Sequence, residues 1–97
     1  MIRHTVVFTL KHKAGSEQEA DFLTKAQTLK NITTVKNFEC LRQVSTKNNF
    51  DFGLSMEFDN QEDYDFYSNH PDHDYFVSTR WIKEVEDFME IDYISLA

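Results

Sequence analysis

Two stretches of alternating apolar and polar residues restrict the fold of this chain more than any other feature of its sequence. In residues 2–10 one parity is apolar apart from a single histidine, and it holds Ile2, His4, Val6, Phe8 and Leu10. In residues 50–58 the alternation is strict, and the apolar parity holds Phe50, Phe52, Leu54, Met56 and Phe58. Because successive side chains of a strand point to opposite faces of a sheet, both segments are predicted to be strands with one buried face. His4 is predicted to lie on that buried face, beside the helices.

A capping pattern after the first strand predicts where a helix begins. Ser16 and Glu19 match the S-x-x-E capping box, in which the serine side chain accepts a hydrogen bond from a first-turn N–H. Apolar residues then recur at helical spacing through about residue 30. A weaker alternation in residues 35–44 predicts a second strand, which is expected to form a hairpin with residues 50–58.

The rest of the chain is predicted to hold a broken helix and a last strand. Asn60 is a typical N-cap residue, and His70-Pro71 interrupts the helix that it opens. Pro71 fits the first turn of a new helix, where its missing N–H is not needed. Residues 89–93 alternate again and are predicted to be a strand. The helical spacing after Pro71 is carried by Phe76, Val77, Trp81, Ile82, Val85 and Phe88.

The element order is therefore β-α-β-β-α-β with a broken second helix. This order is typical of an α+β, ferredoxin-like fold with a four-stranded antiparallel sheet and helices on one face. A length of 97 residues suits one core, so residues 1–97 are expected to form a single domain. Val7, Leu41 and one parity of the last strand keep the opposite sheet face apolar. Because a face without helices must meet water or another molecule, we predict a homodimer through the sheet faces.

Composition narrows the classes of partner. Ten basic and seventeen acidic residues give a net charge of −7, which disfavours binding to nucleic acid and to anionic membranes. No apolar run approaches the roughly 18 residues that span a bilayer, and we expect a cytoplasmic protein. Cys40 stands alone, so it cannot form an intrachain disulfide and is expected to be a buried apolar side chain. No pattern indicates a nucleotide, flavin or haem cofactor.

Four segments of the sequence match the pattern of a known protein family. They are residues 2–8, Met56-Glu57-Phe58, residues 67–76 and Ile91-Asp92-Tyr93, and the H-P-x-H element of residues 67–76 is the most specific of them. Through them nearly the whole chain resembles the stress-responsive A/B-barrel (Dabb) domain family of the dimeric α+β barrel superfamily. The resemblance implies a dimeric α/β barrel, in which two sheets face each other. Thr33-Thr34 departs from the Pro-Gly that family members often carry before the second strand, which concerns the shape of that loop.

The resemblance also implies a set of catalytic candidates. The plant polyketide-cyclase branch of this family uses a histidine of the first strand with a tyrosine and a histidine around H-P-x-H, and His4, Tyr67 and His73 match these positions. An imidazole can take a proton from an enolisable carbon near neutral pH, and a phenol can donate to the developing oxyanion. The residues expected to bind a ligand are these three together with His70, Tyr75 and Trp81.

Three hypotheses for these residues stay open at this point. They can be hydrogen-bonded parts of the core, they can bind a small organic molecule without chemistry, or they can form a cofactor-free polyketide-cyclase-like enzyme or lyase acting on an enolisable carbonyl compound. A cavity of about 300 Å³ or more surrounded by these groups favours catalysis. Polar atoms met by backbone groups, with no void, favour a structural role.

Two clusters of acidic residues are weaker candidates. His70 and His73 with Asp72 and Asp74 do not make a tetrahedral ligand set, so no metal site is predicted. The acidic residues between 84 and 92 are predicted to be a solvated face, because they lack the glycine and the regular spacing of a calcium-binding loop.

Overall fold

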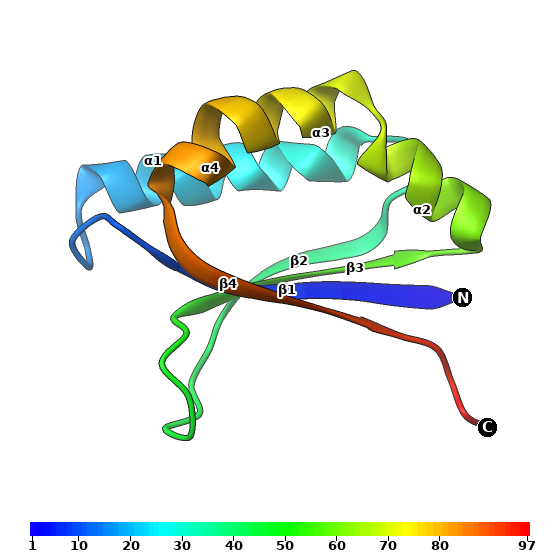
Figure 1. Cartoon of the computed structure of the whole chain (residues 1–97), viewed down its shortest axis with the longest axis horizontal. Helices are drawn as coiled ribbons and strands as arrows, with labels where there is room; N and C mark the ends of the chain where they lie inside the picture. The colour runs from blue at the N-terminus through cyan, green and yellow to red at the C-terminus, as the bar shows by residue number, and fades with distance from the viewer.

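The computed structural model describes residues 1–97 and has the α+β architecture that the sequence predicts. All helices lie on one side of the sheet, and the loop between the second and third strands extends away from them (Figure 1). The ferredoxin-like fold class is confirmed. The elements are β1 (Ile2–Leu10), α1 (Glu17–Ala26), the 3₁₀ helix η1 (Gln27–Asn31), β2 (Lys36–Arg42), β3 (Phe52–Phe58), α2 (Gln61–Ser68), α3 (Pro71–Phe76), the π-helical turn η2 (Val77–Trp81), α4 (Ile82–Glu84) and β4 (Val85–Tyr93).

The sheet has the strand order β2-β3-β1-β4, and all its pairs are antiparallel. β1 is therefore central, with β3 on one side and β4 on the other. His4 of β1 pairs with Met56 of β3 and with Asp92 of β4. The two ends of the chain thus meet side by side in the sheet, and this pairing sets the neighbours of His4.

Local signals place the helix starts where the sequence predicts them. The Ser16 side chain accepts a hydrogen bond from the Glu19 N–H, and the Asn60 side chain accepts one from the Asp63 N–H. Pro71 stands in the first turn of α3, where no N–H is required. The break between α2 and α3 therefore follows from the sequence, and it fixes the geometry of the residues on either side.

Three sequence predictions are corrected by the structure. The helix ends at Glu84, so Val85 and Phe88 belong to β4 although they continue the helical spacing. Pairing with β1 explains this, because the Lys11 N–H donates to the Glu84 carbonyl and Leu10 pairs with Val85. The strand predicted over residues 35–44 is shorter, since β2 ends at Arg42 and Val44 in the following loop is 85% exposed. Cys40 is only partly buried against the core.

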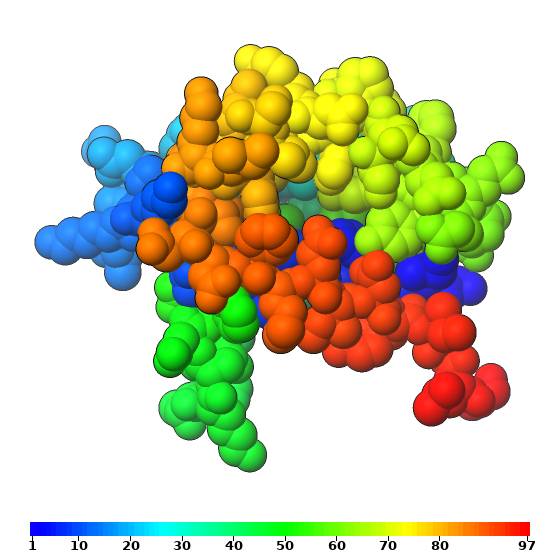
Figure 2. All heavy atoms as spheres, viewed as in Figure 1, coloured from blue at the N-terminus to red at the C-terminus, as the bar shows by residue number.

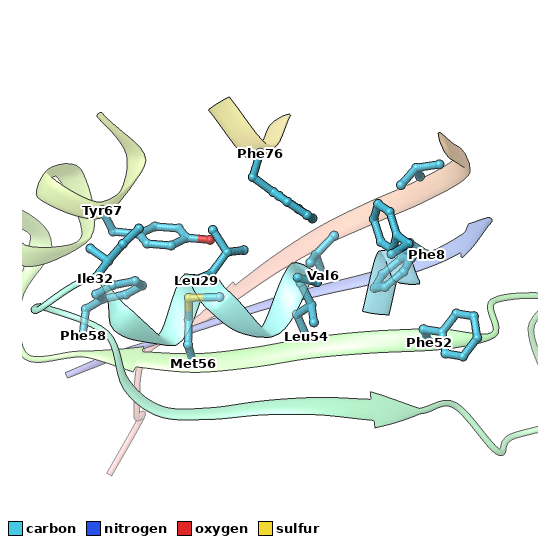
Figure 3. Close-up of a cluster of buried hydrophobic side chains, with 13 residues drawn as sticks. Val6, Phe8, Leu29, Ile32, Phe52, Leu54, Met56, Phe58, Tyr67 and Phe76 are labelled. Carbon is cyan, nitrogen blue, oxygen red and sulfur yellow. The ribbon is translucent and has the colours of Figure 1, made fainter. Parts of the chain in front are cut away.

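The core lies between the sheet and the helices (Figure 3). β1 contributes Val6 and Phe8, and every second residue of β3 from Phe52 to Phe58 is buried. Phe22 of α1 packs against Phe8 with ring centroids 5.9 Å apart. The remaining buried apolar residues come mainly from the helical layer and are Ala26, Leu29, Ile32, Tyr67, Phe76 and Val85.

The opposite sheet face carries an apolar strip, as predicted. Val7 pairs with Gly53 on one side and with Met89 on the other, and Gly53 pairs with Leu41. Leu41 and Met89 are 44% and 48% exposed. This face is uncovered in the single chain.

None of the helices has the length and the apolar composition that a membrane span requires.

Candidate functional site

A cavity of about 450 Å³ lies between the sheet and the helical segment α3–η2–α4. In the space-filling view it appears as a hollow between the yellow and orange helical segments and the orange-red strand β4 (Figure 2). Nine of its twelve lining residues are hydrophobic, and the polar ones are His4, His73 and Glu90. The apolar lining is Val6, Leu29, Leu54, Phe76, Val77, Trp81, Ile82, Val85 and Phe88.

His4 is held at the cavity by a carboxylate and a phenol. Its Nδ1 lies 2.6 Å from Asp92 Oδ1, and the Tyr64 hydroxyl lies 2.8 Å from Asp92 Oδ2 and 2.8 Å from His4 Nδ1. Because a carboxylate only accepts, Nδ1–H donates to Asp92 and the Tyr64 hydroxyl donates to the other carboxylate oxygen. His4 Nε2 then carries the free lone pair and can act as a base.

The free nitrogen of His4 faces open space. His4 is 6% exposed, and Nε2 has no hydrogen-bond partner in the chain. Every side-chain nitrogen or oxygen that is fully buried in this protein has a hydrogen-bond partner. His4 Nε2 has none, so it is accessible, and the access is from the cavity that His4 lines. The predicted burial of His4 on the helix side of β1 is confirmed.

His73 approaches the same cavity from the helical layer. Helix α2 ends at Ser68, and the free carbonyl of Ser68 accepts from His73 Nδ1 at 3.1 Å. His73 Nε2 makes no hydrogen bond within the chain. Burial lowers the pKa of His73 because it disfavours the charged imidazolium, although the Ser68 carbonyl and Asp74 act in the opposite direction. A neutral imidazole therefore faces the cavity at neutral pH.

The ring of Tyr67 lies near both histidine rings. Its ring centroid is 4.6 Å from that of His73 and 6.2 Å from that of His4. Tyr67 is 3% exposed and its hydroxyl makes no hydrogen bond within the chain. Figure 3 shows this hydroxyl pointing from α2 toward the region of the cavity-lining residues Leu29 and Phe76. Burial, with the nearby carboxylate of Glu90, raises the pKa of Tyr67, so it stays a phenol and a proton donor.

The structure brings His4, Tyr67 and His73 together and places His4, His73 and Trp81 in the cavity wall, whereas Tyr67 stands next to the histidines and is not a lining residue. The other two predicted ligand-binding residues lie away from the cavity. His70 caps α3 by accepting from the Asp72 N–H, and its ring meets Phe66 edge to face. Tyr75 is 64% exposed and borders a separate, smaller cavity of about 240 Å³. Both residues belong to the helix surface and its break, because α3 turns only one of its faces toward the sheet.

Sequence reasoning missed three residues at the site, namely Tyr64, Glu90 and Asp92. The prediction of a solvated acidic face is wrong for Glu84, which is partly buried and bonds to Arg80 and to His12. Asp92 is exposed as predicted, but it also bonds to His4. The available signal was strand parity: Phe88, Glu90 and Asp92 share one parity of the last strand, which lies next to the first. No three His, Cys, Asp or Glu side chains lie close enough together to hold a metal ion.

Comparison with known proteins supports the architecture. The family model for Dabb, the Stress Responsive A/B Barrel Domain, matches residues 2–95. A Dabb protein with a ferredoxin-like fold from Mesorhizobium loti MAFF303099 is 54% identical, with a TM-score of 0.97 and coverage of 99% of this chain and 97% of that one. No curated protein matches the chain.

More distant structures share the fold. A dimeric ferredoxin-like protein of unknown function from Thermobifida fusca YX is 21% identical, with a TM-score of 0.79 and coverage of 97% of this chain and 90% of that one. The hydroxynitrile lyase from Passiflora edulis is 16% identical, with a TM-score of 0.84 and coverage of 99% and 94%. At these identities the likeness concerns the fold alone.

Proposed function

This chain belongs to the stress responsive A/B barrel (Dabb) family, and we propose that it binds a small organic molecule in the cavity between its sheet and its helices. One observation carries the proposal. His4 Nε2 and His73 Nε2 are polar atoms without partners in the chain, and both residues line an apolar cavity of about 450 Å³. The Tyr67 hydroxyl also has no partner, and the Tyr67 ring lies near both histidine rings. Small-molecule sites have this composition, with apolar walls and a few polar groups that orient the ligand.

A second function is favoured by the hydrogen bond between His4 and Asp92. A carboxylate that accepts from Nδ1–H fixes the tautomer and stabilises the imidazolium that forms when Nε2 takes a proton. For an enolisable carbonyl compound, His4 Nε2 would take the proton from the carbon next to the carbonyl, and the electron pair would move to the carbonyl oxygen. The Tyr67 hydroxyl would donate to that oxyanion. This is a cofactor-free reaction of the cyclase or lyase type.

We also propose that the chain works as a homodimer through its open sheet face. The apolar strip around Val7, Leu41 and Met89 supports this, as does the dimeric relative from Thermobifida fusca. Light scattering should give about twice the chain mass of 11.5 kDa. Met89→Lys places a charge in the strip and should shift the mass to that of one chain. A wild-type protein that stays monomeric at micromolar concentration contradicts the dimer.

The binding proposal is tested by a ligand screen that follows thermal unfolding. A ligand present at 100 times its dissociation constant stabilises the folded state by about 2.7 kcal/mol. Hits should be lost in His4→Ala and in His73→Ala and kept in Tyr75→Ala, because Tyr75 lies outside the cavity. Hits that persist in both histidine variants would place the binding site elsewhere.

The catalytic proposal has its own readout. Proton abstraction beside a carbonyl exchanges that hydrogen for deuterium in D₂O, which NMR follows directly. For ketones among the hits, we expect the hydrogen next to the carbonyl to exchange faster in the presence of the protein than in buffer alone. This acceleration should fall at least tenfold in His4→Ala and in Tyr67→Phe. Exchange at the buffer rate would leave binding without chemistry as the function.

A further inference from the structure

The cavity lining has an acidic side chain and no lysine or arginine to balance it. Its only polar lining groups are two imidazoles and the carboxylate of Glu90, and no lysine or arginine lines it. Arg80, which lies in the π-helical turn beside the cavity, is held in ion pairs with Glu84 and Asp21 at 2.5 Å and 2.7 Å. No free cation is therefore available to neutralise a negative group inside the cavity.

Glu90 stands on the cavity side of β4 without a partner. It pairs with Val6 across the β1–β4 ladder, and Val6 is a buried residue of the helix-facing side. Glu90 makes no ion pair or side-chain hydrogen bond within the chain, unlike Asp92, which bonds to His4 and Tyr64. The carboxylate is close enough to the hydroxyl groups of Tyr67 and Tyr64 to contribute to their raised pKa values.

We propose that Glu90 makes this cavity selective for uncharged carbonyl or hydroxyl compounds with an apolar body, and that it excludes carboxylic acids. The inference rests on the proposed binding function and names the class of ligand. A ligand carboxylate at the polar end would stand beside the Glu90 carboxylate. Glu90 is exposed on one side, and the apolar walls of the cavity reduce the screening of the repulsion on the other. An uncharged carbonyl oxygen avoids this repulsion and can still accept a hydrogen bond from the Tyr67 hydroxyl.

The mouth of the cavity agrees with an apolar ligand body. Ile82 is 67% exposed and Phe88 is 49% exposed, and both line the cavity. An alkyl or aryl group that covers these side chains removes apolar surface from water, which is favourable. An apolar ligand body is therefore favoured at the rim. The polar head would then lie inward, beside His4, His73 and Glu90.

The experiment uses a matched pair of probes, 2-decanone and decanoate. Both are unbranched chains of ten carbon atoms, and they differ in a neutral carbonyl at the second carbon against a charged carboxylate at the first. Trp81 is the only tryptophan and lines the cavity, so its fluorescence reports binding directly. Dissociation constants are measured for the wild type, for Glu90→Gln and for Glu86→Gln, which removes the same charge from an exposed position of β4 outside the cavity.

We expect 2-decanone to bind the wild type at least about tenfold more tightly than decanoate, and Glu90→Gln to narrow this ratio at least about threefold by tightening decanoate alone. A neutral ketone enters any apolar cavity more readily than an anion, so the change in the ratio tests the role of Glu90. Glu86→Gln should keep the wild-type ratio. A ratio that stays unchanged in Glu90→Gln, or equal affinities in the wild type, would overturn the inference. Failure of both probes to bind any of the three proteins would instead refute the proposed binding function, and the inference with it.

Discussion

Strands β3 and β4 flank β1 on its two sides, and their helix-facing side chains differ in burial. On β3, Phe52, Leu54, Met56 and Phe58 are at most 4% exposed. On β4, Phe88 is 49% exposed, and the next two residues of that parity, Glu90 and Asp92, are acidic and exposed. β3 is an inner strand of the sheet, whereas β4 is an edge strand. The β3 side of the helical layer is closed, and the β4 side leaves the cavity.

The comparison separates stability from recognition within one layer. A closed side gains free energy from buried apolar area, and an open side keeps polar groups available for a ligand. His4 shares β1 with the core residues Val6 and Phe8, so the core holds the His4 imidazole in place while β4 supplies its hydrogen-bond partner Asp92. Substitutions on β3 should therefore act on stability, and substitutions on β4 on binding.

The largest expected effect is on β3. Phe58→Ala removes a fully buried ring that stacks on Tyr64 at 4.9 Å, and it should cost about 3–5 kcal/mol of the free energy of unfolding. Phe88→Ala removes a half-exposed ring and should cost roughly 1 kcal/mol. Urea unfolding at one protein concentration measures both values. Equal losses for the two variants would remove the distinction between the strands.

A smaller effect is expected for the carboxylate on β4. Asp92→Asn weakens the bonds to His4 and Tyr64 and should cost about 1 kcal/mol. Its stronger signature is the tautomer of His4, because an amide can either accept or donate. We expect ¹⁵N NMR of the imidazole to show a proton on Nδ1 in the wild type and a mixture of tautomers in Asp92→Asn. A wild-type spectrum with the proton on Nε2 would contradict the assigned base.

The smallest effect is a pH dependence carried by His73. Its pKa is lower in the folded state than the ordinary 6.5, so the unfolded chain binds the proton more readily. The contribution is complete above about pH 6.5 and is lost as the pH falls below that value. Wild-type stability should therefore fall between pH 7.5 and pH 5.5 by more than that of His73→Asn, whose amide can still donate to the Ser68 carbonyl. Paired urea titrations at the two pH values measure the difference, and equal falls would show that His73 is not the group responsible.

Most of the fold could be predicted from local patterns. The alternation of residues 2–10 and 50–58 predicts β1 and β3, although β3 begins only at Phe52, and the caps at Ser16 and Asn60 predict the helix starts. The end of the last helix could not be predicted, because Ile82, Val85 and Phe88 fit a three-residue spacing that helices share. Tertiary pairing of Leu10 with Val85 decides that boundary, and no short window of sequence contains both residues.

The histidines of the candidate site could be predicted from the sequence, but the acidic residues beside them could not. The family pattern gives His4, Tyr67 and His73, all of which lie together. Asp92 is separated from His4 by 88 residues, and its role depends on the register between the first and last strands. The same register places Glu90 opposite Val6. A charged residue on the inner side of an edge strand is a departure from the core pattern that only the sheet order can explain.

That departure has a consequence for solubility. β4 is nine residues long and ends the sheet, so one side of its backbone has no strand beside it. Long apolar edges of this kind recruit strands from other molecules and begin aggregation, and inward-pointing charges and bulges oppose such pairing. β4 has both devices, in Glu90 and Asp92 and in the register shift beside Leu10. Replacing Glu90 and Asp92 with apolar residues to enlarge the cavity would therefore also remove charges that oppose edge-to-edge aggregation through β4.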